Sequence, residues 1–173
     1  TGSVGKTSVK EHLKYFLSTH GNISTAIKSY NNYLGILISL INIDLHSILA
    51  IFEIGTNNFN EIKKLTSIVM PHQVIITNIF PTHLENLKTT RNVAIEKSDI
   101  FNPRFNPNIE LLILPNSNDD EDYLNKLSKK YKISSVITFG KNDEANYCLQ
   151  NIEVENNFLS KIKIKTPDEL IEF

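Results

Sequence analysis

The chain has one cysteine, no tryptophan and almost no net charge, and each of these shortages excludes a class of protein. The lone Cys148 excludes an internal disulfide framework and fits a reducing compartment, where we expect it to be a small buried residue. A formal net charge of -1 gives no basic field for nucleic acid. No apolar run is long enough to span a bilayer, and no secretory leader pattern is present. We therefore expect a cytoplasmic protein.

The remaining composition is that of a globular domain. Hydrophobic residues make up 40% of the 173 residues, which is enough to bury one good core. No internal repeat or low-complexity linker divides the chain. We therefore expect a single domain over residues 1–173.

Helical and strand patterns alternate along most of the chain. The run SILAIFEIG is almost continuously apolar, as in a central parallel strand covered on both faces. After Gly140 the helical pattern stops, and two strands follow around a polar turn at 155–157. This order predicts an α/β fold with a mainly parallel, doubly wound sheet and an antiparallel C-terminal hairpin. We expect helices over 7–20, 33–41, 58–70, 92–101 and 121–131, and strands over 23–27, 47–55, 74–79, 109–114, 133–139, 147–154 and 158–165.

Side-chain spacing indicates which helix faces are buried. In the first predicted helix Val9, Leu13, Phe16 and Leu17 fall on one face. In the last predicted helix the inward residues are expected to be Tyr123, Leu124, Leu127 and Tyr131.

The first eight residues, TGSVGKTS, have the pattern of a phosphate-binding loop that runs into a helix. Glycines let successive backbone N–H groups converge on an anion, the helix N-terminus adds partial positive charge, and the lysine reaches the outer phosphates. The full pattern has a further glycine before Thr1, so we expect the chain to begin inside the motif. A glycine turn with a chance GKT is the alternative, but the amphipathic helix that follows favours phosphate binding. The predicted phosphate-binding residues are Gly2, Ser3, Val4, Gly5, Lys6, Thr7 and Ser8.

Polar residues follow two buried strands at the sheet edge where ligands bind in open α/β folds. Glu53 ends one strand and could hold Mg²⁺ opposite the phosphate loop, although local backbone donors could also satisfy its carboxylate. Asn78 ends the next strand, and His83 follows it. A lone histidine is usually structural, so His83 is a candidate ligand only because of its position.

Five segments together resemble the ATP-binding central domain of the Mur ligases: TGSVGKTSVKE, SYNNYLG, AIFEIGTNNFNEI, ITNIFPTHLEN and VAIEKSDIF. Within that family the chain looks most like the branch that joins D-alanyl-D-alanine to a UDP-N-acetylmuramoyl tripeptide. The resemblance is strong over residues 1–101 and looser as far as Gly140. One departure is Asn60, which stands where family members usually have glycine.

The resemblance implies a role for several residues. Lys6 would contact the outer phosphates of ATP, and Thr7 and Glu53 would hold a first Mg²⁺. His83 would bind a second Mg²⁺ together with Lys97, which matches the lysine that family members carbamylate. A carbamylated lysine offers hard anionic oxygens, which suit Mg²⁺ as an ammonium group cannot. Lys6, Lys97 and His83 are thus the implied catalytic residues.

The resemblance also implies substrate-binding and supporting residues. Asn32 matches a family position near the phosphates and the sugar-peptide substrate, and Asn31 beside it is a weaker match. Asn78 and Pro81 match the strand-end turn that presents His83.

The implied reaction is activation of a carboxylate by ATP to an acyl phosphate, which the amine of D-Ala-D-Ala then converts to an amide. No side-chain nucleophile is required. The other substrate would be UDP-MurNAc-tripeptide, and complete ligases add an N-terminal domain that binds the uridine nucleotide and a C-terminal domain that closes over ATP. Neither fits in 173 residues, so we expect this polypeptide to be inactive alone.

Two other interpretations stay open. The chain could be a noncatalytic nucleotide-binding remnant of a split or decaying ligase gene. It could also belong to another amide ligase of the same superfamily, such as a folylpolyglutamate synthetase, although the segments SVGKTSVKE and EIGTNN favour the Mur ligases.

Overall fold

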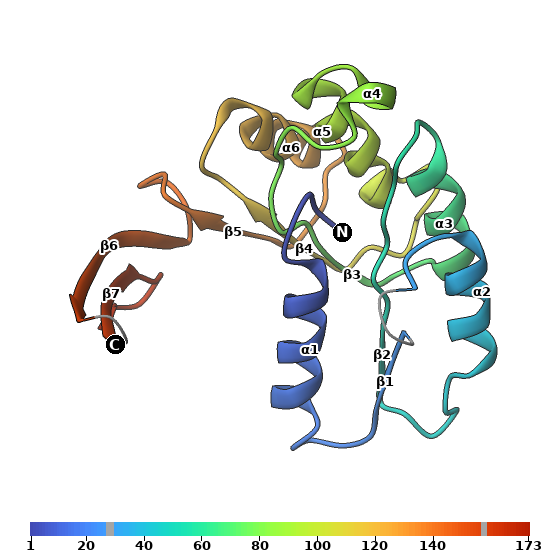
Figure 1. Ribbon diagram of the computed structural model, residues 1–173, viewed down its shortest axis with the longest axis horizontal. Helices are drawn as coiled ribbons and strands as arrows, with labels where there is room; N and C mark the ends of the chain where they lie inside the picture. Colours follow the sequence, from blue (N-terminus) through green and yellow to red (C-terminus); the bar gives the residue numbers. More distant parts are fainter. Residues whose placement is uncertain (27–29, 157–158) are drawn as a thin grey trace.

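A computed structural model describes residues 1–26, 30–156 and 159–173. Helices and strands alternate up to residue 140, as predicted, and three strands complete the chain (Figure 1). The helices are α1 (Lys6–Leu17), α2 (Tyr33–Ile41), α3 (Glu61–Val69), α4 (Leu84–Leu87), α5 (Thr90–Ser98), the 3-10 turn η1 (Asp99–Phe101) and α6 (Asp119–Lys130). The strands are β1 (Ile23–Thr25), β2 (Leu49–Ile51), β3 (Gln73–Ile75), β4 (Leu111–Pro115), β5 (Val136–Gly140), β6 (Tyr147–Asn156), β7 (Leu159–Lys165) and β8 (Leu170–Glu172).

The strands form two hydrogen-bonded sheets. β1 and β2 pair in parallel, whereas β3, β4, β5 and β6 form a parallel series that continues into antiparallel β7 and β8. The predicted α/β class, with a mainly parallel arrangement and antiparallel C-terminal strands, is therefore confirmed. The described ladders do not join β2 to β3.

The first residues of the chain lie alongside the end of β3. The Thr1 amino group donates to the Ile75 carbonyl at 2.9 Å, and the Thr77 amide donates to the Thr1 carbonyl at 2.9 Å. This is the exchange of a parallel strand pair. The chain therefore enters the phosphate loop along the edge of β3, and this places the loop at the carboxyl end of that strand.

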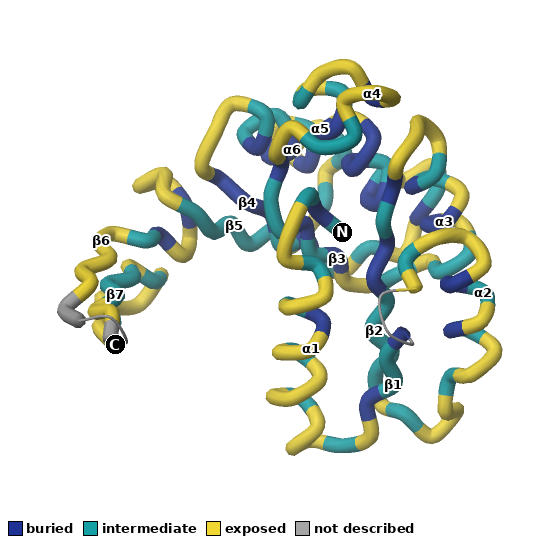
Figure 2. Tube along the Cα trace, viewed as in Figure 1, coloured by how far each residue is buried: buried dark blue, intermediate teal, exposed yellow. Residues whose placement is uncertain are grey.

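The core lies between the β3–β4–β5 sheet and the helices α3, α5 and α6 (Figures 1 and 2). Ile62, Ile76 and Leu112 are completely buried there. Phe101 is also fully buried and meets the Tyr131 ring edge-on at 6.1 Å between centroids. Of the inward residues predicted for α6, Leu124 is fully buried, and Tyr123, Leu127 and Tyr131 pack against the core, as expected.

The first helix is less buried than its pattern predicts. Val9, Leu13 and Leu17 are half-buried, but Phe16 is 64% exposed, so its assignment to the buried face is wrong. Phe16 packs edge-on against the ring of Tyr15, which is also exposed. α1 contacts β1 but lies away from the helices over the larger sheet (Figure 1), which leaves its aromatic turn exposed.

Several predicted strands are shorter than their apolar runs. The run 47–55 contributes only three residues to a ladder, because Glu53 and Gly55 have already turned toward side-chain and loop partners. The predicted strand 23–27 forms up to Thr25, and its last residue lies outside the described residues. In the predicted C-terminal hairpin, residues 157 and 158 lie outside them as well. β8 has no counterpart in the prediction.

The strands β6, β7 and β8 form an arm that extends away from the helices (Figure 1). Cys148 at its base is buried, as predicted, with 1% of its surface exposed. No helix in the described residues is long and apolar enough to cross a membrane.

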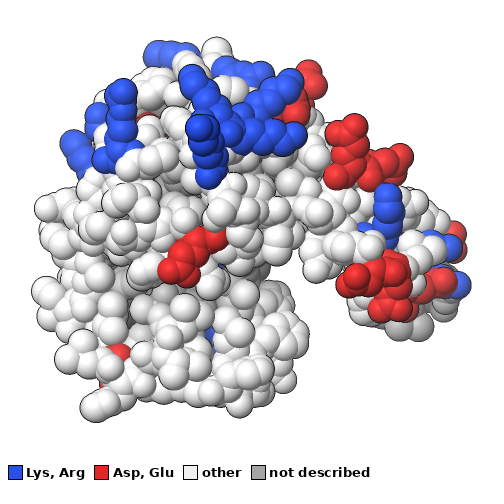
Figure 3. All heavy atoms as spheres, turned by 180° about the vertical axis from the view of Figure 1, so that it is seen from behind, with Lys and Arg blue, Asp and Glu red and all other residues white. Residues whose placement is uncertain are grey.

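Lysines that are dispersed along the sequence gather in space. Seen from behind, lysine and arginine side chains cover much of the upper part of the molecule, and acidic side chains flank the arm (Figure 3). α6 separates its own charges, with Asp119, Asp120, Glu121 and Asp122 in its first turn and Lys129 and Lys130 in its last. This order complements the helix dipole.

Candidate functional site

Two glycines shape the loop before α1. Gly5 occupies the N-cap position in the left-handed conformation, with φ of 80°, so α1 begins directly at Lys6. Gly2 has φ of 146° and lies against the chain that leaves β3. A Cβ at Gly2 would lie 1.9 Å from the Thr77 hydroxyl and 2.9 Å from the Thr77 amide nitrogen. Only glycine fits there. The Ser3 and Val4 amides donate to Asn78, so the donors available to an anion are the amide groups of the first turn of α1.

Lys6 folds back over this loop. Its ammonium group donates to the Gly2 carbonyl at 3.1 Å and to the Ser3 carbonyl at 3.4 Å. The charge is therefore held over the concave side of the loop, where the sequence predicts the outer phosphates. The turn that the motif predicts is completed by Val4 and Gly5, and α1 begins at Lys6.

The structure brings Thr7 and Glu53 together at the carboxyl end of β2. The Thr7 hydroxyl donates to Glu53 Oε2 at 2.7 Å, and the Asn31 side-chain amide donates to Glu53 Oε1 at 2.8 Å. Glu53 is 4% exposed, so its charge is held in place by two neutral donors. A hydroxyl and a carboxylate are hard oxygen ligands, and together they fit one side of a Mg²⁺ shell.

Lys97 reaches the same loop from α5. It is 2% exposed, and its ammonium group donates to the Gly2 carbonyl at 3.1 Å. Burial, reinforced by the positive charge of Lys6 and opposed by the negative charge of Glu96, lowers the pKa of Lys97 to about 8. The neutral amine, which is the form that reacts with CO₂, is therefore accessible close to neutral pH.

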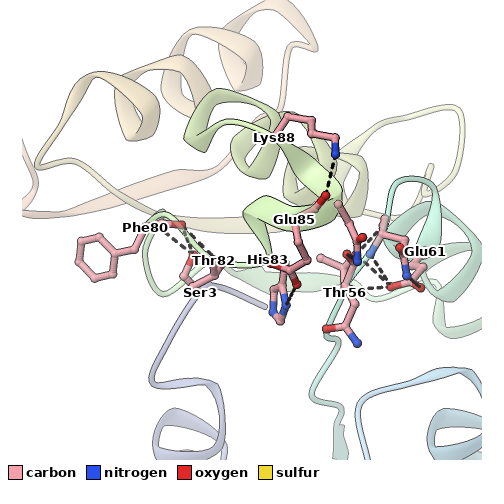
Figure 4. Close-up of polar contacts among 11 residues, drawn as sticks. Ser3, Thr56, Glu61, Phe80, Thr82, His83, Glu85 and Lys88 are labelled. Atoms are coloured by element: carbon pink, nitrogen blue, oxygen red, sulfur yellow. Dashed lines mark hydrogen bonds and ion pairs between the residues drawn. The ribbon is translucent and has the colours of Figure 1, made fainter.

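The segment after β3 holds the other side of the loop. Asn78 accepts from the Val4 amide at 3.0 Å and donates to the Val4 carbonyl at 3.1 Å. The Ser3 hydroxyl accepts from the Phe80 amide at 2.9 Å and from Thr82 at 3.3 Å (Figure 4). Asn78 thus supports the loop through both the amide and the carbonyl of Val4.

His83 follows this turn in a left-handed conformation, with φ of 55°, at the N-cap of α4. Its Nδ1 lies 3.9 Å from Glu85 Oε1, and the side chain is 39% exposed (Figure 4). Among the described residues His83 contacts Glu85 and Lys97 contacts the Gly2 carbonyl, so no hydrogen bond between them preassembles the second predicted cation site. Within residues 1–26, 30–156 and 159–173, no three His, Cys, Asp or Glu side chains are grouped as a metal site.

Asn31 and Asn32 line a pocket of about 670 Å³ between α2 and α3. The pocket is also lined by Gly55, Thr56, Asn57 and Lys64. Asn32 accepts from the Gly35 amide at 2.9 Å and caps α2, which explains why the helix begins at Tyr33 as predicted. Of the two asparagines, Asn31 has the side chain that contacts Glu53.

Sequence reasoning missed two buried carboxylates that hold the loops of the site. Glu96 is 1% exposed and accepts from the Asn60 and Ile62 amides. Glu121 is 2% exposed and accepts from the Ile79 amide at 3.1 Å and the Ser117 amide at 2.9 Å. Each belongs to a helix whose pattern predicts a solvated acid, and only the tertiary fold shows the partner.

The chain matches one family model over its whole length: residues 1–173 match the Mur ligase middle domain. Among curated proteins it is 36% identical over 145 residues to the UDP-N-acetylmuramoyl-tripeptide–D-alanyl-D-alanine ligase of Rickettsia prowazekii, which covers 84% of this chain and 32% of the relative. The protein of the same name from Buchnera aphidicola is 32% identical over 168 residues, covering 97% and 35%. The chain therefore spans about a third of the length of these relatives.

Solved structures give the same result for the fold. MurF from Acinetobacter baumannii superimposes with a TM-score of 0.83 at 26% identity, over 99% of this chain and 36% of that one. MurF from Thermotoga maritima, solved in complex with ADP, has a TM-score of 0.81 at 23% identity, over 99% and 38%.

Proposed function

Because this chain belongs to the Mur ligase family, we propose that it is the ATP-binding central domain of a ligase that joins UDP-MurNAc-tripeptide to D-Ala-D-Ala. The observation that carries the proposal is the meeting of three elements at one loop: Lys6 over its concave side, Thr7 hydrogen-bonded to the buried Glu53, and Lys97 on the Gly2 carbonyl. The curated relatives that match this chain share the activity named here.

ATP would bind with its outer phosphates on residues 2–8. The amide groups at the N-terminus of α1 would supply directed donors, and Lys6 would supply a full positive charge. Lys6 would exchange its bonds to the Gly2 and Ser3 carbonyls for phosphate oxygens, which requires only rotation of a long side chain. The same charge would stabilise the phosphoryl group during transfer.

Two Mg²⁺ ions would complete the site. The donor set of Thr7 and Glu53 fits the first ion, because both groups present oxygen and already lie within hydrogen-bond distance. The second would take His83 and a carbamylated Lys97. Bound Mg²⁺ supplies electrostatic stabilisation of charge on the transferred phosphoryl group. The fit of Lys97 depends on its conversion from a cationic amine to an anionic carbamate, which its lowered pKa favours.

The tripeptide carboxylate would attack the γ-phosphorus of ATP to give an acyl phosphate and ADP. The amine of D-Ala-D-Ala would then displace phosphate and form the amide. Asn31 and Asn32 would orient the first substrate in the 670 Å³ pocket, next to Glu53. The role of this chain is thus to hold the nucleotide and the carboxylate in reacting geometry.

The relatives are about three times as long as this chain, and their N- and C-terminal domains are the expected partners. Binding of the uridine nucleotide and of the adenine ring of ATP would depend on those domains. Such a ligase would work in the cytoplasm, where ATP and nucleotide-linked precursors are found.

Calorimetric titration with Mg²⁺ and a nonhydrolysable ATP analogue tests the proposal. We expect one site per chain, and Lys6→Ala should weaken binding by at least about a hundredfold, because a charge-assisted phosphate contact is lost. Lys14→Ala is the matched control, since Lys14 is exposed in the last turn of the same helix. If the folded, unmutated chain binds no nucleotide, the motifs are inherited but the site is not assembled in this chain, which contradicts the proposal.

A further inference from the structure

Glu96 is a buried carboxylate with three donors and no place in the motif-based site. Its Oε1 accepts from the Ile62 amide at 2.9 Å and from the Thr56 hydroxyl at 3.4 Å, and its Oε2 accepts from the Asn60 amide at 2.8 Å. These donors lie 34 to 40 residues away along the chain. A carboxylate that accepts several backbone N–H bonds in a buried site is held firmly and holds its donors in turn.

Thr56 and Asn60 belong to the segment between β2 and α3, and Ile62 belongs to the first turn of α3; this stretch forms one wall of the pocket. Thr56 and Glu61 line the pocket directly. Glu61 binds the outer part of the same segment by accepting from the Asn57 amide at 2.7 Å and the Asn58 amide at 3.1 Å. The wall is therefore held by one carboxylate from its own helix and one from α5.

The backbone conformation of Asn60 shows why the pocket wall needs the Glu96 carboxylate. It adopts φ of 70°, the left-handed conformation that glycine prefers, at the N-cap of α3. Its side chain does not cap the helix. Instead, Glu96 from α5 accepts from the Asn60 and Ile62 amides, which have no partner within the helix. The fixed acceptor stabilises a backbone shape that asparagine alone adopts less readily.

Glu96 also adjoins Lys97 in the sequence. α5 thus contacts the pocket wall through Glu96 and the Gly2 carbonyl of the phosphate loop through Lys97. Two successive residues of one helix cannot move independently, because the helical backbone fixes them relative to each other. The helix is a rigid connection between the loop and the wall.

We propose that Glu96 is a positioning residue of the ligase site, which fixes the pocket wall at 56–62 relative to Lys97 and the phosphate loop. The inference rests on the proposed function for the identity of the two sites that α5 connects. Occupation of the loop by a nucleotide displaces the neighbours of Gly2, and α5 transmits this displacement to the wall that faces the carboxylate substrate.

Amide NMR of the isotope-labelled chain tests the clamp without nucleotide. In Glu96→Gln the carboxamide carries no charge and turns an N–H₂ group toward one of the donors, so the Asn60 and Ile62 amide protons should shift upfield. Their hydrogen exchange should accelerate at least about tenfold, as expected for the loss of a charged hydrogen bond. Glu121→Gln is the matched control: it removes a similar buried carboxylate and should change the Ile79 and Ser117 amides but leave Asn60 and Ile62 unchanged.

The unmutated chain gives the same test should Glu96→Gln fail to fold. Scalar couplings across the hydrogen bonds should connect the Asn60 and Ile62 nitrogens to the side-chain carboxyl carbon of Glu96. Unchanged Asn60 and Ile62 amides in a folded Glu96→Gln chain, or absent couplings in the unmutated chain, would overturn the proposal.

Titration with Mg·ADP tests the connection. In the unmutated chain we expect shifts at residues 2–8 and at 56–62, and in Glu96→Gln at residues 2–8 alone. A wall that responds equally in both chains, or in neither while nucleotide binds, contradicts the proposal. Failure of the unmutated chain to bind Mg·ADP counts against the proposed function instead, and the nucleotide-free experiment still decides the role of Glu96.

Discussion

The Thr7 hydroxyl and the Glu53 carboxylate, 46 residues apart in the sequence, meet at a hydrogen bond of 2.7 Å. This contact joins the first turn of α1 to the carboxyl end of β2. The phosphate loop and the acidic strand end are therefore one site, with Asn31 on its other side.

Thr7→Val tests this contact because valine keeps the branched shape and removes the hydroxyl. We expect the Mg²⁺-dependent affinity for nucleotide to fall at least about tenfold, since Glu53 loses a donor and the cation loses an oxygen ligand. Thr7→Ser retains the hydroxyl and should bind nearly as well as the unmutated chain. Equal Mg²⁺ dependence for valine and serine variants in calorimetry would show that the hydroxyl is not a ligand.

Lys97 should make stability depend on alkaline pH. Its folded pKa of about 8 lies below the ordinary value of 10.5, so the unfolded chain binds more protons between these values. Stability therefore rises with pH through this window, and below the folded pKa the cost of burying the charge is fully present, on the order of 3 kcal/mol. Urea unfolding of the unmutated chain and of Lys97→Met in CO₂-free buffer at pH 7.5 and 10 measures this. Between pH 7.5 and 10 the unmutated chain should gain unfolding free energy relative to Lys97→Met. An equal change in both chains would contradict the lowered pKa of Lys97.

Carbamylation of Lys97 is open to direct observation. In ¹³C-bicarbonate at pH 8 we expect a carbamate signal from the unmutated chain that is absent from Lys97→Met. The neutral amine is populated there because the folded pKa is about 8. Addition of Mg²⁺ should strengthen the signal, since the cation stabilises the anionic form. A signal that survives in Lys97→Met would assign it to another amine.

Gly2→Ala and Gly5→Ala form a pair that separates crowding from backbone strain. A Cβ at Gly2 would overlap the Thr77 hydroxyl and crowd its backbone, whereas a Cβ at Gly5 would meet no heavy atom within 4 Å. We expect Gly2→Ala to lower the free energy of unfolding by about 2 to 3 kcal/mol and Gly5→Ala by about 1 kcal/mol. Chemical denaturation checks the order, and a larger loss for Gly5→Ala would contradict it.

Arg91 joins α5 to α6 by charge and by stacking. Its Nε lies 3.1 Å from Asp120 Oδ1, and its guanidinium group lies 4.8 Å from the centroid of the Tyr123 ring. Arg91→Ala should cost about 1 kcal/mol of unfolding free energy, with part of the loss screened by salt. Arg91→Lys retains the charge but not the planar stacking, so its thermal unfolding midpoint should lie between those of the unmutated chain and Arg91→Ala.

Strong local signals in the sequence predicted much of this molecule. The GKTS sequence indicated the phosphate loop, Tyr33–Ile41 formed where its pattern placed it, and the alternation of elements indicated the α/β class. These features depend on residues close together in the chain. The division into two sheets could not be predicted, because it depends on which strand edges meet in space.

The supporting shell of the site was also beyond the sequence. Glu96 and Glu121 are charged residues on polar helices, and only the approach of Asn60, Ile62 and Ile79 explains their burial. Asn60 is instructive because it adopts the left-handed backbone that glycine prefers. For Phe16 the helical period was right, but none of the elements that the structure describes covers this side chain.

The arm of β6, β7 and β8 gives the molecule a second level of cooperativity. Among the described residues its ladder with the body consists of two pairs, Phe139 with Tyr147 and Gly140 with Cys148. Few interactions therefore penalise its separate opening, and hydrogen exchange should report a low-energy unfolding unit beside a slowly exchanging core. A protease would cut the opened arm while the nucleotide-binding body stays folded, so limited digestion should yield a trimmed body before it yields small fragments.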